Sequence, residues 1–156
     1  VPSIVCELFN ASAKREDSFI AGLSMGGYGA LKIALREPER FCAGAGLSPC
    51  GDIKSLDLFS RELSPVFGTE LQVPDEDDIM YLAAKQKDNP LRPRLYMGIG
   101  KEDFLYENAN NLRRKLEECG YDFAYREGAG AHNWDFWDEY IQYVFEWLEK
   151  QIAPQA

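Results

Sequence analysis

Apolar positions along the chain follow two different periods. Short apolar runs of strand length alternate with longer stretches in which apolar residues recur at helical spacing, as Leu31, Ala34 and Leu35 do. The pattern predicts strands at 18–22, 41–47, 94–100 and 122–127, and helices at 25–36, 104–119 and 133–152. Such alternation is typical of a parallel sheet with crossover helices. We therefore predict an α/β fold, with a mostly parallel sheet flanked by helices, in one domain over residues 1–156.

Residues 48–89 interrupt this alternation. Prolines and glycines separate short helical pieces, and the clearest helix is expected at 75–87 with Asp75 as its N-terminal cap. A loose helical excursion between two strands commonly forms a lid or a pocket wall. We expect residues 48–89 to form one here.

Length and charge narrow the class of protein. The chain has 156 residues, 46% of them hydrophobic, which is enough for one domain with a substantial core. Its 26 acidic and 17 basic side chains give a net charge of -9, which repels nucleic-acid phosphates and anionic lipid. No apolar run reaches the roughly 18 residues that a membrane span requires. We expect neither nucleic acid nor a membrane as a partner.

The cysteines give little support for a metal site. Cys6, Cys42, Cys50 and Cys119 are scattered without a C-x-x-C pair, and the chain has one histidine. This arrangement disfavours zinc, so we predict buried free thiols and no metal. Free thiols suit a reducing compartment and predict a cytoplasmic location. Secretion stays an alternative, because the chain begins at Val1 and not at an initiator methionine.

The segment 22–26 matches G-x-S-x-G, with a predicted strand before it and a predicted helix after it. This context predicts a nucleophile elbow, in which Ser24 lies at a sharp turn and the flanking glycines avoid a steric clash. Gly27 and Gly29 are expected to allow close approach of helix and strand. The backbone N–H of Met25 would stabilise an oxyanion, and one such donor is typically worth about 2.7–4 kcal/mol. The alternative is a glycine-rich turn used only for packing.

A serine nucleophile needs a base, and His132 is the one histidine that the chain offers. It follows the last predicted strand in a glycine-rich loop. The acid is expected after a strand between serine and histidine, and Asp103 fits this order. The neighbouring Glu102 is the competing candidate. Asp135 and Asp138 are disfavoured, because they follow the histidine and lie on a predicted helix.

Aromatic residues are concentrated in the last predicted helix. A stripe at helical spacing is expected to face the sheet as part of the core, and it comprises Phe136, Tyr140, Tyr143 (or Val144) and Trp147. Trp134 is only two residues from the predicted base. We therefore treat Trp134 as a candidate for substrate binding.

Several of these segments together resemble the putative esterase family of α/β-hydrolases. The resemblance rests on 22–31, on 38–41 followed by 46–48, on 100–103 and on 130–137. The family includes S-formylglutathione hydrolases (esterase D), feruloyl, acetylxylan and tributyrin-type esterases, and the antigen 85 mycolyltransferases. The chain looks most similar to tributyrin-type and carbohydrate esterases, because formylglutathione hydrolases more often have histidine where Leu23 and Tyr28 stand. The resemblance implies an α/β-hydrolase fold and hydrolysis of carboxylic esters through an acyl-enzyme, without a cofactor.

The chain departs from the family before the nucleophile. Family members place several strands and the second oxyanion donor upstream, whereas only 17 residues precede Ser18 here, enough for one helix at 5–13. We therefore expect the chain to be the C-terminal portion of an esterase, containing the C-terminal half of the sheet. Alone it would expose a sheet edge, so the N-terminal half or a second copy of the chain is an expected partner.

The resulting hypothesis is a serine esterase that acts on short-chain acyl or carbohydrate-linked esters, with Ser24, His132 and Asp103 as its triad. One alternative is an acyltransferase of the mycolyltransferase type, in which an alcohol or sugar replaces water. The other is a truncated scaffold that keeps the residues without activity.

Overall fold

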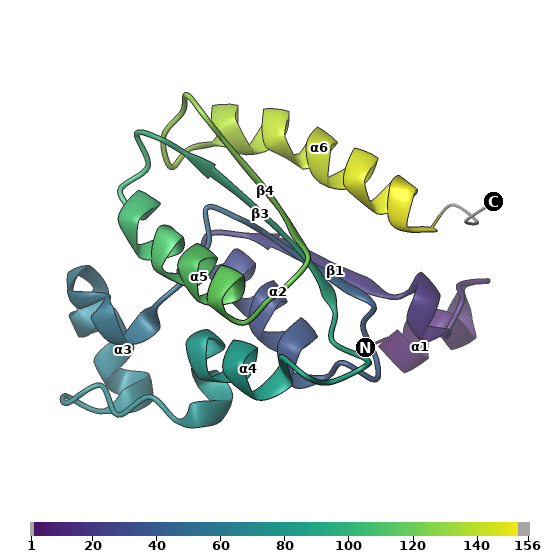
Figure 1. Ribbon diagram of the computed structural model, residues 1–156, viewed down its shortest axis with the longest axis horizontal. Helices are drawn as coiled ribbons and strands as arrows, with labels where there is room; N and C mark the ends of the chain where they lie inside the picture. The colour runs from purple at the N-terminus through teal and green to yellow at the C-terminus, as the bar shows by residue number, and fades with distance from the viewer. Residues whose placement is uncertain (1, 153–156) are drawn as a thin grey trace.

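Four parallel strands run through the centre of the molecule in this computed structural model, which describes residues 2–152 (Figure 1). They are β1 (Phe19–Leu23), β2 (Ala43–Leu47), β3 (Arg94–Gly100) and β4 (Phe123–Gly128), and they lie in the order β1-β2-β3-β4. In this register Ala21 lies opposite Ala45, which in turn lies opposite Tyr96. The predicted α/β fold with a mostly parallel sheet is confirmed.

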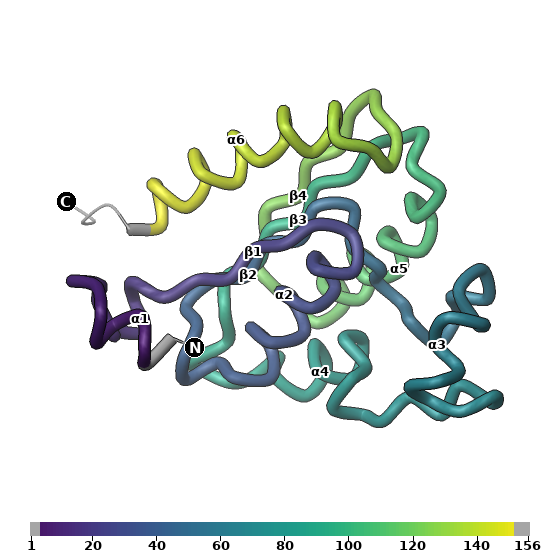
Figure 2. The backbone as a smooth tube through the Cα atoms, turned by 180° about the vertical axis from the view of Figure 1, so that it is seen from behind, coloured from purple at the N-terminus to yellow at the C-terminus, as the bar shows by residue number. Residues whose placement is uncertain are grey.

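Six α-helices accompany the strands within the described residues: α1 (Pro2–Leu8), α2 (Met25–Arg36), α3 (Ser60–Phe67), α4 (Ile79–Gln86), α5 (Tyr106–Glu118) and α6 (Trp134–Ile152). The helices predicted at 25–36 and 133–152 agree with α2 and α6 to within one residue. The helix expected at 5–13 is instead the shorter α1. Figure 2 shows α1 at one end of the molecule and α3 at the other.

The cap of α4 differs from the prediction. Residues Asp75–Asp77 form a separate 3-10 turn, and the helix begins after Asp78. The Asp78 carboxylate accepts hydrogen bonds from the backbone N–H groups of Met80 (2.9 Å) and Tyr81 (3.3 Å). Asp78 also has the extended backbone that an N-cap requires. The prediction that Asp75 caps this helix was therefore wrong, because Asp75–Asp77 form their own turn before α4 begins.

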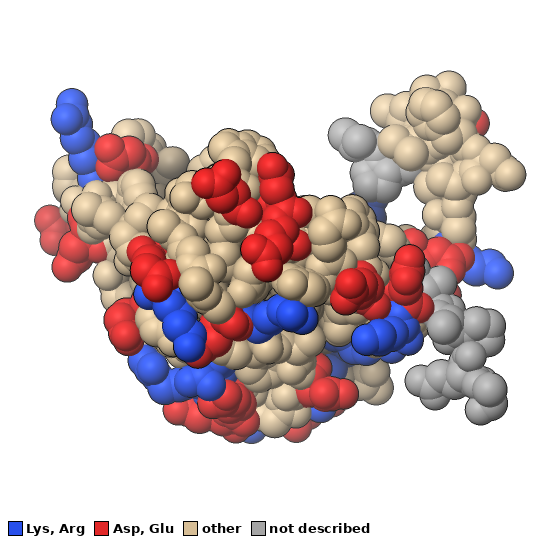
Figure 3. All heavy atoms as spheres, turned by 90° about the horizontal axis from the view of Figure 1, so that it is seen from above, with Lys and Arg blue, Asp and Glu red and all other residues tan. Residues whose placement is uncertain are grey.

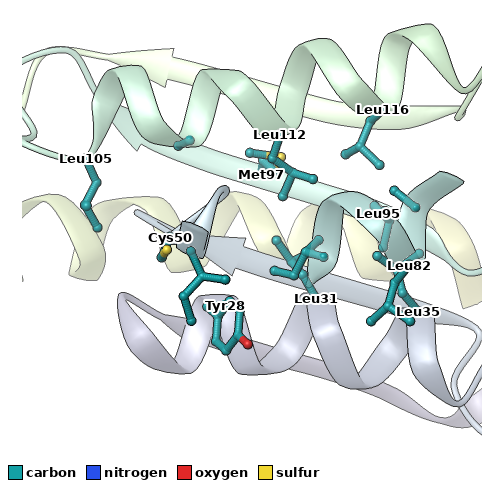
Figure 4. Close-up of a cluster of buried hydrophobic side chains, with 14 of the residues drawn as sticks. Tyr28, Leu31, Leu35, Cys50, Leu82, Leu95, Met97, Leu105, Leu112 and Leu116 are labelled. Carbon is teal, nitrogen blue, oxygen red and sulfur yellow. The ribbon is translucent and has the colours of Figure 1, made fainter. Parts of the chain in front are cut away.

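The helices form two unequal layers around the sheet. Strands added in one direction by right-handed crossovers place their connecting helices on the same face. Accordingly α2, α4 and α5 lie on one face and α6 lies alone on the other (Figure 1). Figure 4 shows part of the larger core, in which Leu31, Met97 and Leu112 meet between the sheet and its connecting helices.

The sequence of β2 explains how both layers approach the sheet. Its alanines and leucine, at 43, 45 and 47, belong to the core under α6. Its glycines face α2, and a Cβ at Gly44 would lie 2.7 Å from the Cβ of Ala34. Strand residues alternate between faces, so this alternation of small residues brings α2 unusually close to the centre of the sheet.

The buried face of α6 follows the predicted stripe only in part. Phe136, Tyr140 and Val144 are buried, as is Leu148 one turn further on. Val144, the alternative considered from the sequence, is fully buried, whereas Tyr143 and Trp147 are half-buried. The contact surface therefore advances in steps of four residues, the spacing of the 4-4 ridges of a helix.

The outer face of α6 is strongly acidic, and Figure 3 views the molecule from this side. Its exposed side chains include Asp135, Asp138, Glu139, Glu146 and Glu149. At one edge of the described sheet, the Phe19 side chain of β1 is 39% exposed. Among residues 2–152, no helix is both long enough and apolar enough to cross a membrane.

Candidate active site

Ser24 occupies a strained turn between β1 and α2. Its backbone has φ 53 and ψ -121, a combination that non-glycine residues rarely adopt. The turn is held because the Ser24 N–H donates to the Leu47 carbonyl (2.8 Å) and the Ser24 carbonyl accepts from the Tyr28 N–H (3.0 Å). These bonds fix the serine at the carboxyl edge of the sheet, where ligands bind in open α/β folds.

The glycines around Ser24 are not equivalent. A Cβ at Gly22 would overlap the Gly26 carbonyl, and a Cβ at Gly27 would lie 3.0 Å from the Leu47 carbonyl oxygen. These two positions fit the predicted close approach. By contrast, a Cβ at Gly26 or Gly29 would meet no atom within 4 Å beyond the backbone of the helix itself. The prediction that Gly26 and Gly29 are required to avoid a clash was therefore wrong. The crowding arises at Gly22 and Gly27, where the strands contact the backbone of α2.

Gly22→Ala is expected to lower the free energy of unfolding by about 1–3 kcal/mol, because the added methyl group forces the elbow apart. Gly29→Ala is the matched control, and it should raise stability by about 1 kcal/mol, the difference in helix propensity. Urea unfolding of both variants and of the unsubstituted chain measures these two changes in the free energy of unfolding. Equal midpoints for the two variants would contradict the steric account of the elbow.

The three residues predicted for the triad lie in hydrogen-bond contact. His132 Nε2 is 2.8 Å from Ser24 Oγ, and His132 Nδ1 is 2.9 Å and 3.0 Å from the two carboxylate oxygens of Asp103. The Asp103 side chain is 0% exposed and that of His132 is 14% exposed. The residues come from the carboxyl ends of three different strands. The arrangement can therefore pass a proton between serine and imidazole while a buried carboxylate orients the ring.

Glu102, the competing acid, has a different position. Its carboxylate accepts a hydrogen bond from the Gly130 N–H (2.6 Å), and its own N–H donates to the Gly130 carbonyl (3.1 Å). Glu102 thus ties the loop after β3 to the loop that carries His132. Asp103 points inward instead and also accepts from the Leu105 N–H (2.8 Å). Asp135 and Asp138 are exposed on α6.

Two aromatic rings enclose the imidazole of His132. The Phe104 ring centroid is 4.5 Å away in a tilted arrangement, and Trp137 contacts the imidazole edge-on at 4.9 Å. The Trp137 Nε1–H donates to Ser48 Oγ (3.0 Å), and Ser48 is fully buried with φ 45. Sequence reasoning missed these contacts. Two signals in the sequence could have found them: Ser48 directly follows a strand, and Phe104 directly follows Asp103, the predicted acid.

Met25 and Trp134 flank the triad in exposed positions. Met25 is the first residue of α2, where backbone N–H groups have no acceptor within the helix. This position is compatible with its predicted oxyanion role. Trp134 is 64% exposed, and its ring contacts Trp137 edge-on at 5.4 Å. It therefore presents a free aromatic face near the base.

A cavity of about 500 Å³ opens beside Ser24. Helix α2 and the segment 48–89 supply most of its wall, and the lining residues are Ser24, Met25, Tyr28, Lys32, Cys50, Ile53, Leu56, Phe59, Glu62, Leu63, Val66, Phe67, Asp77 and Leu105. Burial raises the pKa of the Cys50 thiol to about 12, so this cysteine stays protonated and is no rival nucleophile. Within residues 2–152, no three His, Cys, Asp or Glu side chains are grouped to hold a metal ion.

The cysteines are all free, and their burial differs from the expectation in part. Cys42 and Cys50 are buried, whereas Cys6 and Cys119 are only half-buried. The expectation of uniformly buried thiols was therefore wrong for Cys6 and Cys119, which lie near the ends of α1 and α5.

Comparison with known proteins gives a consistent result. The family described as Putative esterase matches residues 1–145. An acetyl esterase from Caldicellulosiruptor saccharolyticus is 35% identical over 155 residues, and the match covers 92% of this chain and 58% of the relative. The chain thus spans less than two thirds of the length of this relative.

Solved structures of serine hydrolases have the same fold. Fluorophosphonate-binding serine hydrolase F from Staphylococcus aureus superposes with a TM-score of 0.82 at 29% identity, covering 94% of this chain and 60% of its own. An S-formylglutathione hydrolase from the same organism gives a TM-score of 0.77 at 30% identity, with coverages of 94% and 57%. The predicted α/β-hydrolase fold is confirmed.

Proposed function

Because the chain belongs to the Putative esterase family, we propose that it hydrolyses carboxylic esters through an acyl-enzyme, acting on short-chain acyl or carbohydrate-linked esters. The observation that carries the proposal is the continuous hydrogen-bonded series from Ser24 through His132 to Asp103. A serine is activated when its hydroxyl is hydrogen-bonded to an imidazole and that imidazole is hydrogen-bonded in turn to a buried carboxylate.

Acylation begins when Ser24 Oγ attacks the carbonyl carbon of the ester. As the Oγ–C bond forms, the hydroxyl proton moves to His132 Nε2, and the carbonyl oxygen becomes an oxyanion. The N–H of Met25 stabilises this charge at the start of α2, where the helix dipole also favours an anion. The imidazolium then protonates the alcohol oxygen as the C–O bond breaks. Alcohol leaves, and the acyl group stays on Ser24.

Deacylation repeats these steps with water. His132 Nε2 takes a proton from water as its oxygen attacks the acyl carbon, and then returns the proton to Ser24 Oγ as the carboxylic acid leaves. Asp103 remains ionised throughout, holding the proton on His132 Nδ1 and stabilising the imidazolium. Trp134 and Phe104 form the exposed surface beside the base, where the alcohol part of a substrate would lie.

Quenched-flow kinetics with p-nitrophenyl acetate test the proposal. An acyl-enzyme predicts a burst of p-nitrophenol close to one equivalent of enzyme, together with an acetylated Ser24 peptide in the acid-quenched sample. Because p-nitrophenolate is a good leaving group, deacylation is expected to be the slower step, so p-nitrophenol release without either sign would contradict the acyl-enzyme route. Adding a sugar acceptor distinguishes hydrolysis from transfer, since only an acyltransferase would form a new ester in preference to acetate.

A further inference from the structure

The cavity beside Ser24 is a channel that follows one side of α2. Ser24, Tyr28 and Lys32 line it at intervals of four residues, so they lie on one face of the helix. Eight residues separate Ser24 from Lys32, and a helix rises about 1.5 Å per residue, so this wall is about 12 Å long. Figure 4 shows Tyr28 and Cys50 close together near the same end of the core as Leu105.

The chemistry of the channel changes along its length. Phe59, Leu63 and Val66 from the opposite wall are apolar. Paired polar groups lie at the far end, where Lys32 Nζ forms an ion pair with Asp77 (2.8 Å) and the Tyr28 hydroxyl donates to the Asp77 backbone carbonyl. The other charged residue of the lining, Glu62 of α3, is exposed. The Tyr28 hydroxyl is therefore already paired. The middle of the channel offers a surface that favours an apolar occupant over a hydroxyl-rich one.

The position of His132 decides which half of an ester enters the channel. The leaving alcohol must lie next to His132 Nε2, because that atom gives it a proton. Neither His132 nor Trp134 lines the channel, and the Phe104 ring contacts both His132, at 4.5 Å, and the channel-wall residue Phe59, at 6.1 Å. The surface beside His132 is instead open to solvent, because Phe104 is 54% exposed and Trp134 is 64% exposed. Water for deacylation must also approach from this side.

From this geometry we infer that the channel binds the acyl half of the substrate, as an unbranched apolar chain, while the alcohol half lies over Phe104 and Trp134. An extended chain advances about 1.2 Å per bond, so a channel about 12 Å long corresponds to about ten bonds. The ester bond to Ser24 and the clearance of the terminal methyl group take up about three of these, which leaves room for an acyl group of about six to eight carbons before the Lys32–Asp77 pair. The inference rests on the proposed esterase activity, and it extends the proposed acyl group from short to medium length.

Two isomeric esters test the assignment. Ethyl octanoate and octyl acetate have the same atoms, and they differ in whether the long chain belongs to the acid or to the alcohol. We expect kcat/KM for ethyl octanoate to exceed that for octyl acetate by about tenfold or more, because only the octanoyl chain is buried in the channel. Equal values, or a preference for octyl acetate, would overturn the inference.

Substitutions on α3 test whether the preference for ethyl octanoate over octyl acetate arises in the channel. Leu63→Trp fills the channel and should lower the preference for ethyl octanoate about tenfold, whereas Arg61→Trp places the same side chain on the exposed side of α3 and should leave the preference within about twofold. An unchanged preference in folded Leu63→Trp would overturn the inference. Val66→Trp is a second filling variant, because Val66 is 71% exposed and tolerates a larger residue.

p-Nitrophenyl acetate separates this inference from the proposed function. Its acetyl group is too short to need the channel, so its hydrolysis reports on the triad alone. Hydrolysis of p-nitrophenyl acetate without a preference between the isomers would refute the acyl assignment only. Failure of all three esters would refute the esterase proposal and the acyl assignment with it.

Discussion

Ser24→Ala is expected to lower kcat for ester hydrolysis by about a million-fold, which leaves only the residual rate due to binding and the oxyanion donor. The reason is that no other group can accept the acyl chain at this position: the His132 imidazole is directed at Ser24 Oγ (2.8 Å), and the high pKa of Cys50, about 12, keeps its thiol protonated. The measurement is p-nitrophenol release by the purified variant.

The control for this substitution is Ser60→Ala. It makes the same chemical change at an exposed serine in the first turn of α3, outside the channel, and should hydrolyse the ester at the unsubstituted rate. Activity of Ser24→Ala above about one hundredth of the original would show that another residue is the nucleophile, because removing a true serine nucleophile costs far more.

Asp103→Asn is expected to lower kcat by about ten-thousand-fold while the protein stays folded. The amide of the substituted side chain would donate a hydrogen bond to His132 Nδ1 where the carboxylate now accepts one (2.9 Å), and this forces the proton onto Nε2. An imidazole protonated at Nε2 cannot take the proton of Ser24. The side-chain oxygen of asparagine can still accept from the Leu105 N–H, so the loop keeps its shape. Measuring kcat on a purified preparation checks the loss of activity, and urea unfolding of the same preparation checks that the protein is folded.

Glu102→Gln discriminates between the two acidic candidates. Glutamine keeps an oxygen that can accept from the Gly130 N–H, so the link between the two loops survives and kcat should fall by no more than about tenfold. A loss as large as that of Asp103→Asn would mean that the negative charge at position 102 is needed by the base, and the assignment of the acid would be wrong.

The fold was predictable where local pattern and global packing agree. The predicted bounds of β3 and α2 match the structure. Helix α2 combines a helical period with a proline at position 38, and β3 is a short apolar run between Pro93 and Gly100. The hydrogen-bonded contact among Ser24, His132 and Asp103 was predictable for a related reason. A single histidine and the fixed order of serine, acid and base in this fold leave few alternatives. Chain order disfavours Asp135 and Asp138, whereas Glu102 is distinguished from Asp103 only by the direction of its side chain in the structure.

The features that could not be predicted from the sequence depend on contacts between segments that are distant along the chain. Nothing local to Gly26 or Gly29 reveals that their Cβ positions are open, since this depends on how β1 meets α2. The hydrogen bond between Ser48 and Trp137 joins residues 89 positions apart. The channel likewise requires the placement of α3 against α2, which the broken pattern of residues 48–89 does not encode in any period. Sequence periodicity predicts the elements, whereas the site wall arises from their packing.

Intact-mass labelling of the folded 156-residue chain with a fluorophosphonate tests the central claim most directly, because this reagent reacts with an activated serine. We predict one adduct on the unsubstituted chain and none on Ser24→Ala or His132→Ala, since the first lacks the attacking oxygen and the second lacks the base. An adduct that persists in Ser24→Ala, or a folded chain that takes up no label, would contradict the account.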